Sequence, residues 1–504
     1  MVLIGLYYLL LACLSIYGLH RGVLLYFYAT GSNRPSYQLL GDPAQKTGCK
    51  PRITVQLPVF NERFVVSSAI DALSRLRYPR DRVEIQILDD STDETSNIAQ
   101  MAVRRWQRRG ISISYRHRAS RTGFKAGALA EGLKEANGDL VAVFDADFLP
   151  DRDFLEKVVG LFDDPCIGMV QARWDHSNRN HSLLTRVQAL FLDGHFVLEH
   201  GGRFRSGCFF NFNGTAGVWR RAAIESAGGW HSDTLTEDLD LSYRAQLAGW
   251  KFVFVPDVAV PAELPTHMTA FKSQQHRWAK GSTQTCLKVL PVLLRSSLSF
   301  RIKAEACFHL AANFNYLLLV PFCVLLVPVM VVRFHFGIAS GLALIDYFLL
   351  CTAILSVSNF YIVSQRELRS NWRRRCLDIP ALIALSLGLS VNNAVAVMEG
   401  LTGRTGDFVR TPKFGSNNPV ERCAPGYVSL ASWLVWVEMA FAVYFTGALI
   451  FAIAVGLYMV VPFLALFQFG FMYASVGSLI ERSMPAGALP ETSSSRFFAT
   501  DEGK

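Results

Sequence analysis

The sequence predicts an α/β domain with a mostly parallel sheet, inserted between membrane-spanning helices. The chain has 504 residues, of which 51% are hydrophobic, and a mean hydropathy of +0.24, which is too apolar for an ordinary soluble protein of this size. Apolar runs long enough to cross a bilayer lie near the start of the chain and in its last 200 or so residues. Between them, residues 31–300 have a soluble composition in which short β-branched runs alternate with helical patterns, and this alternation is typical of a parallel sheet.

The apolar runs predict five membrane-spanning helices. The first run has no basic stretch before it and no small-x-small cleavage site, so it is predicted to be an uncleaved span rather than a signal peptide. The last run is about twice the length of one span and is interpreted as a hairpin of two spans. The runs are Val2 to Tyr28, Leu310 to Val332, Leu342 to Val363 and Val435 to Ser478.

The segment Leu377 to Leu401 allows two interpretations. It is apolar, but it contains Pro380, two asparagines and Glu399. We interpret it as a helix that lies at the interface or re-enters the membrane, and the alternative is a sixth span.

Basic residues predict the orientation of the chain. "SQRELRSNWRRR", Ser364 to Arg375, carries five arginines directly after a span and should face the cytosol. With five spans, the soluble domain faces the same side and the amino terminus lies outside. The predicted organisation is a span in 1–30, a cytosolic domain in 31–300 with an interfacial helix at its end, two spans in 301–365, a cytosolic basic segment with the interfacial helix in 366–425, two spans in 426–480 and a disordered tail in 481–504.

Polar residues follow three predicted strands of the soluble domain. The predicted strands are Arg52 to Val59, Val83 to Leu88, "ISISYRH", "LVAVFDAD" and Ile167 to Ala172, with helices at Ala99 to Arg109 and in "GFKAGALAEGLKEANGD". Ligands of parallel α/β sheets bind at the carboxyl ends of the strands. The clusters Asn61–Glu62, Asp89–Asp90 and Asp145–Asp147 all fall there, so we expect them to meet at one cleft.

Several classes of site are excluded by missing motifs. The chain has no Gly-x-Gly-x-x-Gly and no Gly-x-x-x-x-Gly-Lys-Ser/Thr, so a bound nucleotide diphosphate needs another source of positive charge, such as a divalent metal on carboxylates. The net charge of +9 suits anionic lipids and a nucleotide diphosphate, whereas basic residues that flank spans argue against a nucleic-acid partner. The ten cysteines form no Cys-x-x-Cys pair, which argues against zinc and a disulfide framework.

Four motifs in order carry a family resemblance. They resemble the D, DxD, TED, QxxRW signature of family 2 inverting glycosyltransferases of the cellulose synthase type, over about Ile53 to Gly281. "FNGTAGVWR", "AGGW", "QARW" and "ELP" are similar to the plant cellulose-synthase-like A mannan and glucomannan synthases. The resemblance implies a GT-A fold. The four motifs are "LDD" at Leu88–Asp90, "DAD" at Asp145–Asp147, "TED" at Thr236–Asp238 and "QQHRW" at Gln274–Trp278.

The resemblance also implies roles for individual residues. It makes Asp238 the general base and Asp145 and Asp147 the ligands of Mg²⁺ or Mn²⁺. The expected nucleotide-sugar contacts are Asp89, Asp90, Asp145, Lys125 and Glu62, and the expected acceptor contacts are Trp278, Gln274, Arg277, Asn213, Gly214, Thr215 and Glu237. Taken singly, each motif has a structural reading: Asp89 and Asp90 can cap a helix, "TEDLDL" can be an acid-rich first helical turn, and Arg277–Trp278 can be a juxtamembrane belt.

A segment in the membrane half resembles the gating loop of cellulose synthases, Phe-x-Val-Thr-x-Lys. In "DFVRTPKFG", Phe408, Thr411 and Lys413 fit the pattern, whereas Arg410 replaces the valine. Such a loop closes over the nucleotide and excludes water. It must reach a cytosolic site, which favours the interfacial interpretation of Leu377 to Leu401.

The predicted function is transfer of a hexose, by inversion, from UDP-glucose or GDP-mannose to a growing β-glucan, mannan or glucomannan, with secretion of the polymer. The alternative is a glycosyltransferase that adds one or a few sugars to a membrane lipid such as ceramide or diacylglycerol. A transporter or scaffold would not need four ordered motifs. Membrane lipids are the other expected partners, and the expected location is the plasma (inner) membrane, or the Golgi membrane of a plant-like eukaryote.

Overall fold

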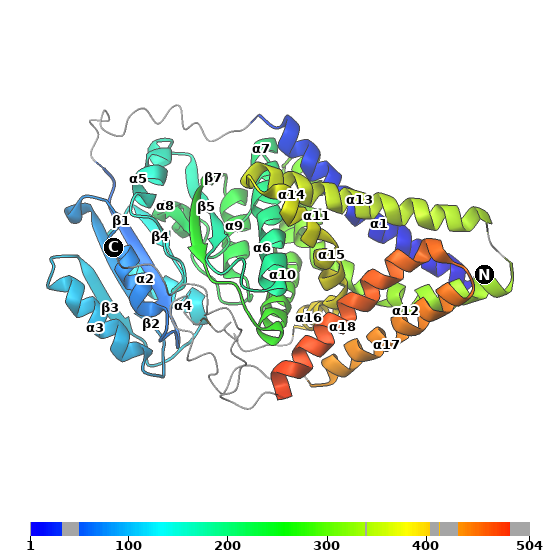
Figure 1. Ribbon diagram of the computed structural model, residues 1–504. Coiled ribbons are helices and arrows are strands. Elements are labelled where there is room, and N and C mark those ends of the chain that lie inside the picture. The colour runs from blue at the N-terminus through cyan, green and yellow to red at the C-terminus, as the bar shows by residue number, and fades with distance from the viewer. Residues whose placement is uncertain (1, 33–49, 338–339, 404–412, 414–431, 484–504) are drawn as a thin grey trace, which may run out of the picture.

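The computed structural model describes residues 2–32, 50–337, 340–403, 413 and 432–483. The soluble segment forms a domain around a seven-stranded sheet, at the left of Figure 1, and the long apolar helices gather at the right. Helix α10 (Met268–Arg295) lies between these two parts and contacts both. It therefore joins the sheet domain to the apolar bundle.

The sheet has the strand order β3-β2-β1-β4-β6-β5-β7. Strands β1 to β4 are parallel to one another, β6 is antiparallel to both β4 and β5, and β5 and β7 are parallel. The carboxyl ends of β1, β2 and β4 therefore lie at one edge. The strands are β1 (Ile53–Val59), β2 (Val83–Asp89), β3 (Ile113–His117), β4 (Leu140–Val143), β5 (Ile167–His176), β6 (Gly217–Arg220) and β7 (Lys251–Ala262).

Both faces of the sheet are covered, which is why its central strands are nearly all apolar. One core packs α2, α3 and α5 on one face, and a second core packs α4, α8 and α9 on the other. The helices of this domain are α2 (Val66–Leu73), α3 (Thr95–Gln107), α4 (Phe124–Lys134), α5 (Phe154–Val158), α6 (Leu183–Gly194), α7 (Gly201–Ser206), α8 (Arg221–Ser226), α9 (Glu237–Leu247) and α11 (Phe300–Leu310), with 3₁₀ turns at Arg80–Arg82 and Val159–Asp163 and a π-helical turn at His195–His200.

Several predicted boundaries are wrong: α3 begins at Thr95 rather than at Ala99, and β4 ends at Val143, before "DAD". Two others differ because of contacts with other parts of the chain. Helix α4 ends at Lys134 rather than at Asn137–Gly138, because Asn137 donates to the Glu84 carboxylate of β2 and Gly138 donates to Thr54 of β1. Strand β5 continues to His176 because it pairs with β7 as far as Ala262.

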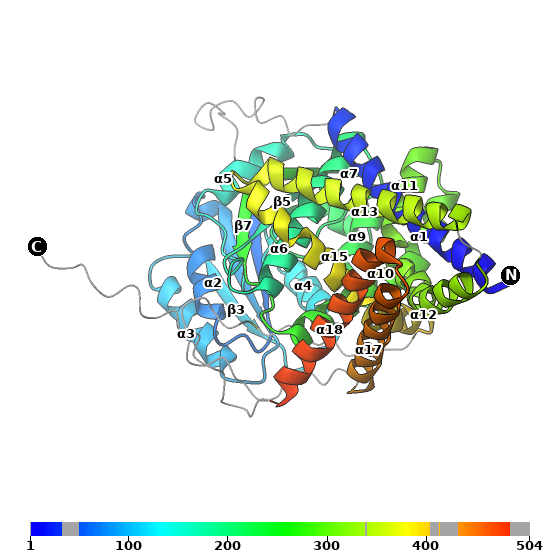
Figure 2. The same cartoon turned by 45° about the vertical axis from the view of Figure 1, so that its right-hand side comes forward.

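The five predicted spans all correspond to helices that are long and apolar enough to cross a membrane, which is the pattern of a multi-pass membrane protein. The last two, α17 and α18, pack side by side as the predicted hairpin (Figure 2). The helices are α1 (Val2–Thr30), α12 (Asn315–His335), α13 (Ser340–Leu368), α17 (Ser432–Ala454) and α18 (Val461–Ser483), with 3₁₀ turns at Ala312–Phe314 and Tyr458–Val460.

The ambiguous segment forms two helices that meet at a bend of 46°. Its polar side chains contact α10: Asn392 donates to the carbonyl oxygen of Lys272, and Glu399 accepts from Lys280. Asn392, Asn393 and Glu399, which made the segment ambiguous, therefore each have a hydrogen-bond partner in the protein. The elements are α14 (Trp372–Arg375), a 3₁₀ turn (Cys376–Asp378), α15 (Ile379–Gly388) and α16 (Ser390–Leu401).

A buried ion pair ties α10 to the apolar bundle. Lys272 Nζ of α10 lies 2.5 Å from Glu438 Oε2 of α17, and both side chains are fully buried.

Each single substitution of Lys272 or Glu438 to methionine leaves one charge buried without its partner and is expected to cost about 3–5 kcal/mol of unfolding free energy. The Lys272→Met/Glu438→Met double variant should lose less than either single variant. Thermal unfolding of the four proteins in one detergent measures this coupling, and additive losses would contradict it.

Candidate active site

A cavity opens at the carboxyl ends of β1 and β4 and is closed from the other side by α9 and α10. Its volume is about 1080 Å³ when the space open to solvent is included. It brings together residues from all four motifs. The predicted site residues that line it are Glu62, Asp90, Lys125, Asp145, Asp147, Asn213, Gly214, Glu237, Asp238, Gln274, Arg277, Trp278 and Lys413.

Asp145 and Asp147 follow β4, and protein cations contact both carboxylates. Lys125 Nζ lies 2.5 Å from Asp145 Oδ1, and Lys413 Nζ lies 2.7 Å from Asp147 Oδ2. The backbone N–H of Glu263 also donates to Asp147. Two carboxylates on one cavity supply the hard oxygen ligands that Mg²⁺ and Mn²⁺ prefer, so these residues fit a divalent cation.

Lys125 connects Asp145 to the loop between α7 and β6. It lies in the first turn of α4, and its ammonium donates to the carbonyl oxygen of Gly214, 3.0 Å away. Burial lowers the pKa of Lys125, but the carboxylates of Asp145, Glu237 and Asp238 outweigh burial and raise it above its usual value. Lys125 is therefore a fixed positive charge at the centre of the site.

Glu237 and Asp238 lie in the first turn of α9. Burial, and then the neighbouring Glu237 carboxylate, raise the pKa of Asp238 to about 7. Burial also raises the pKa of Glu237. A carboxylate with a pKa close to neutral is well matched to proton abstraction from a sugar hydroxyl.

Gly214 gives Asp238 an open approach to the cavity. Its φ of +82° favours glycine, and a Cβ at this position would lie 3.0 Å from Asp238 Oδ2. A side chain there would cover the carboxylate. The glycine therefore leaves room for a substrate hydroxyl at Asp238.

Helix α10 carries the acceptor-side motif and also holds the loop before Asp238. Gln274, Arg277 and Trp278 share one face because they are three and four residues apart. Two turns later, Gln284 accepts from the backbone N–H of Leu235, and Thr285 bonds to Thr236. One helix thus sets the distance between Trp278 and Asp238.

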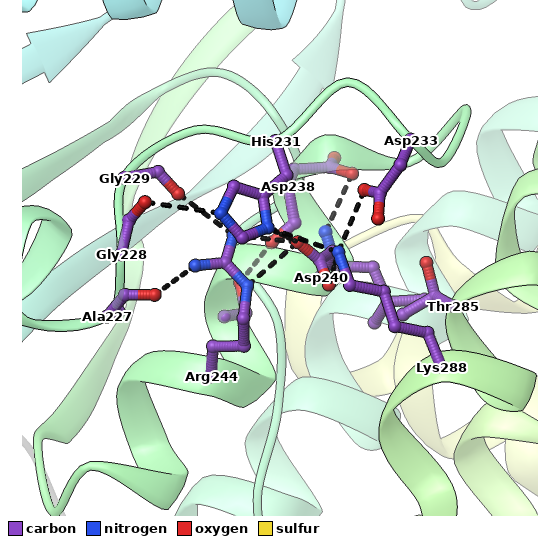
Figure 3. A network of polar contacts seen from close by, with 12 residues as sticks. Ala227, Gly228, Gly229, His231, Asp233, Asp238, Asp240, Arg244, Thr285 and Lys288 are labelled. Atoms are coloured by element: carbon purple, nitrogen blue, oxygen red, sulfur yellow. Dashed lines mark hydrogen bonds and ion pairs between the residues drawn. The ribbon is translucent and has the colours of Figure 1, made fainter.

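A further polar cluster lies beside α9 (Figure 3). Lys288 of α10 contacts Asp233 at 2.8 Å, Asp240 at 3.0 Å and His231 at 3.2 Å. The ligand atoms of these three residues lie within 4.8 Å of one another, but the Lys288 ammonium already lies among them. We interpret the cluster as a clamp on the loop that leads to Asp238, and Arg244 extends it to the carbonyl oxygen of Gly229.

Two predicted residues do not line the cavity. Asp89 is fully buried and accepts from Ser91, Ser96 and Tyr115. Burial would raise the pKa of Asp89, but these hydrogen bonds lower it below its usual value. Asp89 therefore shapes the turn before α3 but does not cap that helix, whose N-cap is Glu94 without a side-chain hydrogen bond, and only Asp90 of the pair lines the cavity.

Thr215 is the other residue outside the lining. Its side chain is buried, and its hydroxyl oxygen accepts from the backbone N–H of Asp145 at 2.9 Å, so it supports Asp145 from behind. Phe408 and Thr411 of the gating-like segment lie outside the described residues.

Sequence reasoning missed two residues that shape the site. Arg118 binds both oxygens of Asp90 at 2.7 and 2.5 Å and also donates to the carbonyl oxygen of Phe124. His195 contacts Asn213 at 2.9 Å from the π-helical turn. Neither residue belongs to a motif, so no sequence signal pointed to them.

Comparisons with known proteins agree with the motifs. A family model described as "Glycosyltransferase like family 2" matches residues 51–281. The chain is 36% identical over 383 residues to probable glucomannan 4-β-mannosyltransferase 9 of Oryza sativa subsp. japonica, which is 72% of this chain and 69% of that protein. It is 46% identical over 251 residues to glucomannan 4-β-mannosyltransferase 2 of Arabidopsis thaliana, which is 49% of this chain and 47% of that protein. Several of the curated relatives are thus matched over about half of their length.

A solved structure has the same fold. The mannosyltransferase PcManGT from Pyrobaculum calidifontis, solved in complex with GDP-mannose and Mn²⁺, aligns with a TM-score of 0.50 and 19% identity over 80% of this chain and 100% of that chain. The predicted GT-A fold is confirmed. The chain belongs to glycosyltransferase family 2, in the group that contains the plant glucomannan 4-β-mannosyltransferases.

Proposed function

We propose that this protein is a membrane-bound inverting β-mannosyltransferase that extends a mannan or glucomannan with mannose from GDP-mannose. The observation that carries this proposal is the single cavity that unites Asp145, Asp147, Asp238 and Trp278. The sequence left glucose and mannose open as the donor sugar. The names of the relatives favour mannose and a 4-β linkage.

The acceptor side of the cavity would hold the growing chain. An aromatic ring can stack on the apolar face of a sugar, so Trp278 is suited to bind the terminal residue of the chain, with Gln274 beside it. This places the terminal hydroxyl toward Asp238. Asp238 would take the proton from that hydroxyl as its oxygen bonds to the anomeric carbon of the donor.

The donor side of the cavity would hold the diphosphate. As the new glycosidic bond forms, the bond from the anomeric carbon to the diphosphate oxygen breaks, and the electron pair leaves with GDP. Lys125 and Arg277 are among the protein cations that line the cavity and would bind that charge. Mg²⁺ or Mn²⁺, held by Asp147 and Asp145, would supply further positive charge for the leaving group.

The lipid glycosyltransferase remains the second candidate because it requires the same carboxylates. The polymer product is favoured by Lys413, which lies in the segment similar to a gating loop and contacts Asp147. The apolar helices beside α10 would carry the polymer across the membrane, with the sheet domain facing the cytosol. We place the protein in the plasma (inner) membrane, or in the Golgi membrane if it comes from a plant-like eukaryote.

Product analysis tests this proposal. Membranes that contain the protein are incubated with GDP-mannose and with UDP-glucose separately, and the sugar, linkage and length of each product are determined. We expect an insoluble β-1,4-linked polymer from GDP-mannose that an endo-β-mannanase digests. A product that partitions into organic solvent and carries one or a few sugars would favour the lipid acceptor.

Membrane topology gives an independent prediction. Single cysteines at positions 375 and 413 should be labelled from the same, cytosolic side by an impermeant maleimide, because the segment between α13 and α17 is proposed not to cross the membrane. A cysteine placed between α12 and α13 serves as the control for the opposite side. Labelling of positions 375 and 413 from opposite sides would make α15 and α16 one broken span.

A further inference from the structure

The π-helical turn between α6 and α7 places two histidines against the loop that lines the acceptor side of the cavity. Hydrogen bonds in a π-helix join residues five apart, so His195 and His200 lie on one face of the turn. His200 Nε2 donates to the carbonyl oxygen of Asn211 at 2.9 Å, and His195 Nε2 lies 2.9 Å from Asn213 Nδ2. The turn therefore holds the loop at two alternate residues.

The surroundings of His195 decide which of its nitrogens carries the proton. Its Nδ1 lies 2.8 Å from Glu199 Oε2, and Glu199 also contacts Arg21 and Arg203. Arg21 donates to the other oxygen of this carboxylate, and Arg203 lies 3.7 Å from the oxygen that faces His195, so the carboxylate acts as an acceptor toward His195. Burial, and then His200 and Arg203, hold the pKa of His195 well below its usual value, so the ring is neutral. Its one N–H is thus on Nδ1 and donates to Glu199, and Nε2 presents a lone pair.

That lone pair orients the Asn213 amide. Nε2 can accept only from the amide NH₂ group, so Nδ2 faces His195 and Oδ1 faces away from it. The Asn213 Oδ1 atom is buried and accepts no hydrogen bond from the residues that the structure describes. The backbone N–H of Asn213 donates to Gln171, which fixes the residue in place. Asn213 therefore offers one oriented acceptor atom.

The position of this atom indicates its ligand. Asn213 lines the cavity together with Trp278 and Asp238, and the next residue, Gly214, lies directly against the Asp238 carboxylate. A hydrogen-bond acceptor at this place suits a neutral sugar hydroxyl, which donates, and does not suit a diphosphate, which only accepts. The ligand is thus a sugar hydroxyl rather than a phosphate, and the neighbouring Asp238, the proposed general base, favours the acceptor sugar.

We propose that His195 is a positioning residue that orients Asn213, so that Asn213 Oδ1 accepts a hydrogen bond from a hydroxyl of the terminal acceptor sugar beside the attacking hydroxyl. The inference rests on the proposed function and deepens it, since it names the atom that binds a hydroxyl of the acceptor sugar. A site built to pair a hydroxyl discriminates strongly against sugars that lack it.

The test separates acceptor binding from donor chemistry. His195→Phe, His195→Gln and Asn213→Ala are compared with the wild type in nanodiscs, with GDP-mannose as donor and β-1,4-mannotetraose as acceptor. We expect His195→Phe and Asn213→Ala each to raise the KM for mannotetraose about tenfold, the worth of one oriented hydrogen bond. Hydrolysis of GDP-mannose and its affinity should stay close to wild type. His195→Gln should recover most of the loss, because its amide oxygen can accept from Asn213 Nδ2.

The control is His176→Gln, at a buried histidine of β5 that does not line the cavity. It should lower the melting temperature and leave the KM for mannotetraose unchanged. If wild-type protein uses mannotetraose and Asn213→Ala keeps the wild-type KM, the inference is overturned, even where His195→Phe fails to fold. Equal effects of the His195 and His176 variants on KM would also overturn it. If the wild-type protein hydrolyses GDP-mannose but transfers no mannose to mannotetraose, the proposed function is overturned, and the inference with it.

Discussion

Asp238→Asn is expected to lower the turnover of mannosyl transfer by about 10²- to 10⁴-fold, the usual contribution of a positioned general base. The asparagine is nearly isosteric but cannot take the proton of the acceptor hydroxyl. Donor affinity, measured by calorimetry with GDP-mannose, should survive, because the groups proposed to bind the diphosphate are Lys125 and the metal held by Asp145 and Asp147 rather than Asp238. Radiolabel transfer in the same detergent measures turnover.

The matched control is Asp257→Asn, which removes an exposed carboxylate of β7 that does not line the cavity. Turnover of this variant should stay close to wild type. Near wild-type turnover of Asp238→Asn would mean that another group is the base. Loss of donor affinity in that variant would assign Asp238 to the donor side instead.

The same base predicts the pH dependence of the rate. Asp238 works in its deprotonated form, and burial together with Glu237 raises its pKa to about 7, so kcat should fall as the pH drops below about 7. Glu237→Gln removes the neighbouring negative charge and should lower the pKa of Asp238, which moves this acid limb to lower pH. A limb that stays in place in Glu237→Gln would argue against Asp238 as the group that titrates.

Asp147→Asn is expected to abolish transfer activity and also to weaken the binding of GDP-mannose. The substitution removes a charged oxygen ligand from the proposed cation site, so the diphosphate loses positive charge. Excess EDTA should have the same effect on wild-type protein, and Mg²⁺ or Mn²⁺ should reverse it. Calorimetric titration of GDP-mannose with and without Mn²⁺ measures the metal dependence directly. Full activity in excess chelator would contradict the metal assignment.

Two variants control for the loss of charge as such. Asp147 also contacts Lys413, so Asp147→Asn breaks that ion pair as well. Lys413→Met breaks the same pair but keeps the carboxylate, and donor binding should still depend on the metal. Asp151→Asn removes an exposed carboxylate four residues further along and should leave both donor binding and its metal dependence unchanged.

The members of the site could be read from the sequence because chemistry restricts them to few residue types. Carboxylates that follow apolar strands predicted the edge of the sheet where the cavity lies, since parallel strands end on one side. The five spans were readable because a bilayer demands a minimum length of apolar helix. The roles assigned to individual residues rest on the family resemblance and stay predictions until variants are measured.

What the sequence determined by itself was thus the set of motifs, the apolar spans and the α/β class, because these depend on local composition and on spacing along the chain. Only the tertiary structure decided which of two adjacent acids reaches the cavity. Asp89 accepts hydrogen bonds from Ser96 and Tyr115 inside the protein, whereas Asp90 lines the cavity. Only the fold brings His195 to Asn213, eighteen residues away, and Lys272 to Glu438. Such contacts join residues that lie apart in the sequence, so no local sequence pattern predicts them. Because these side chains are buried, each polar group needs the partner that only the fold supplies.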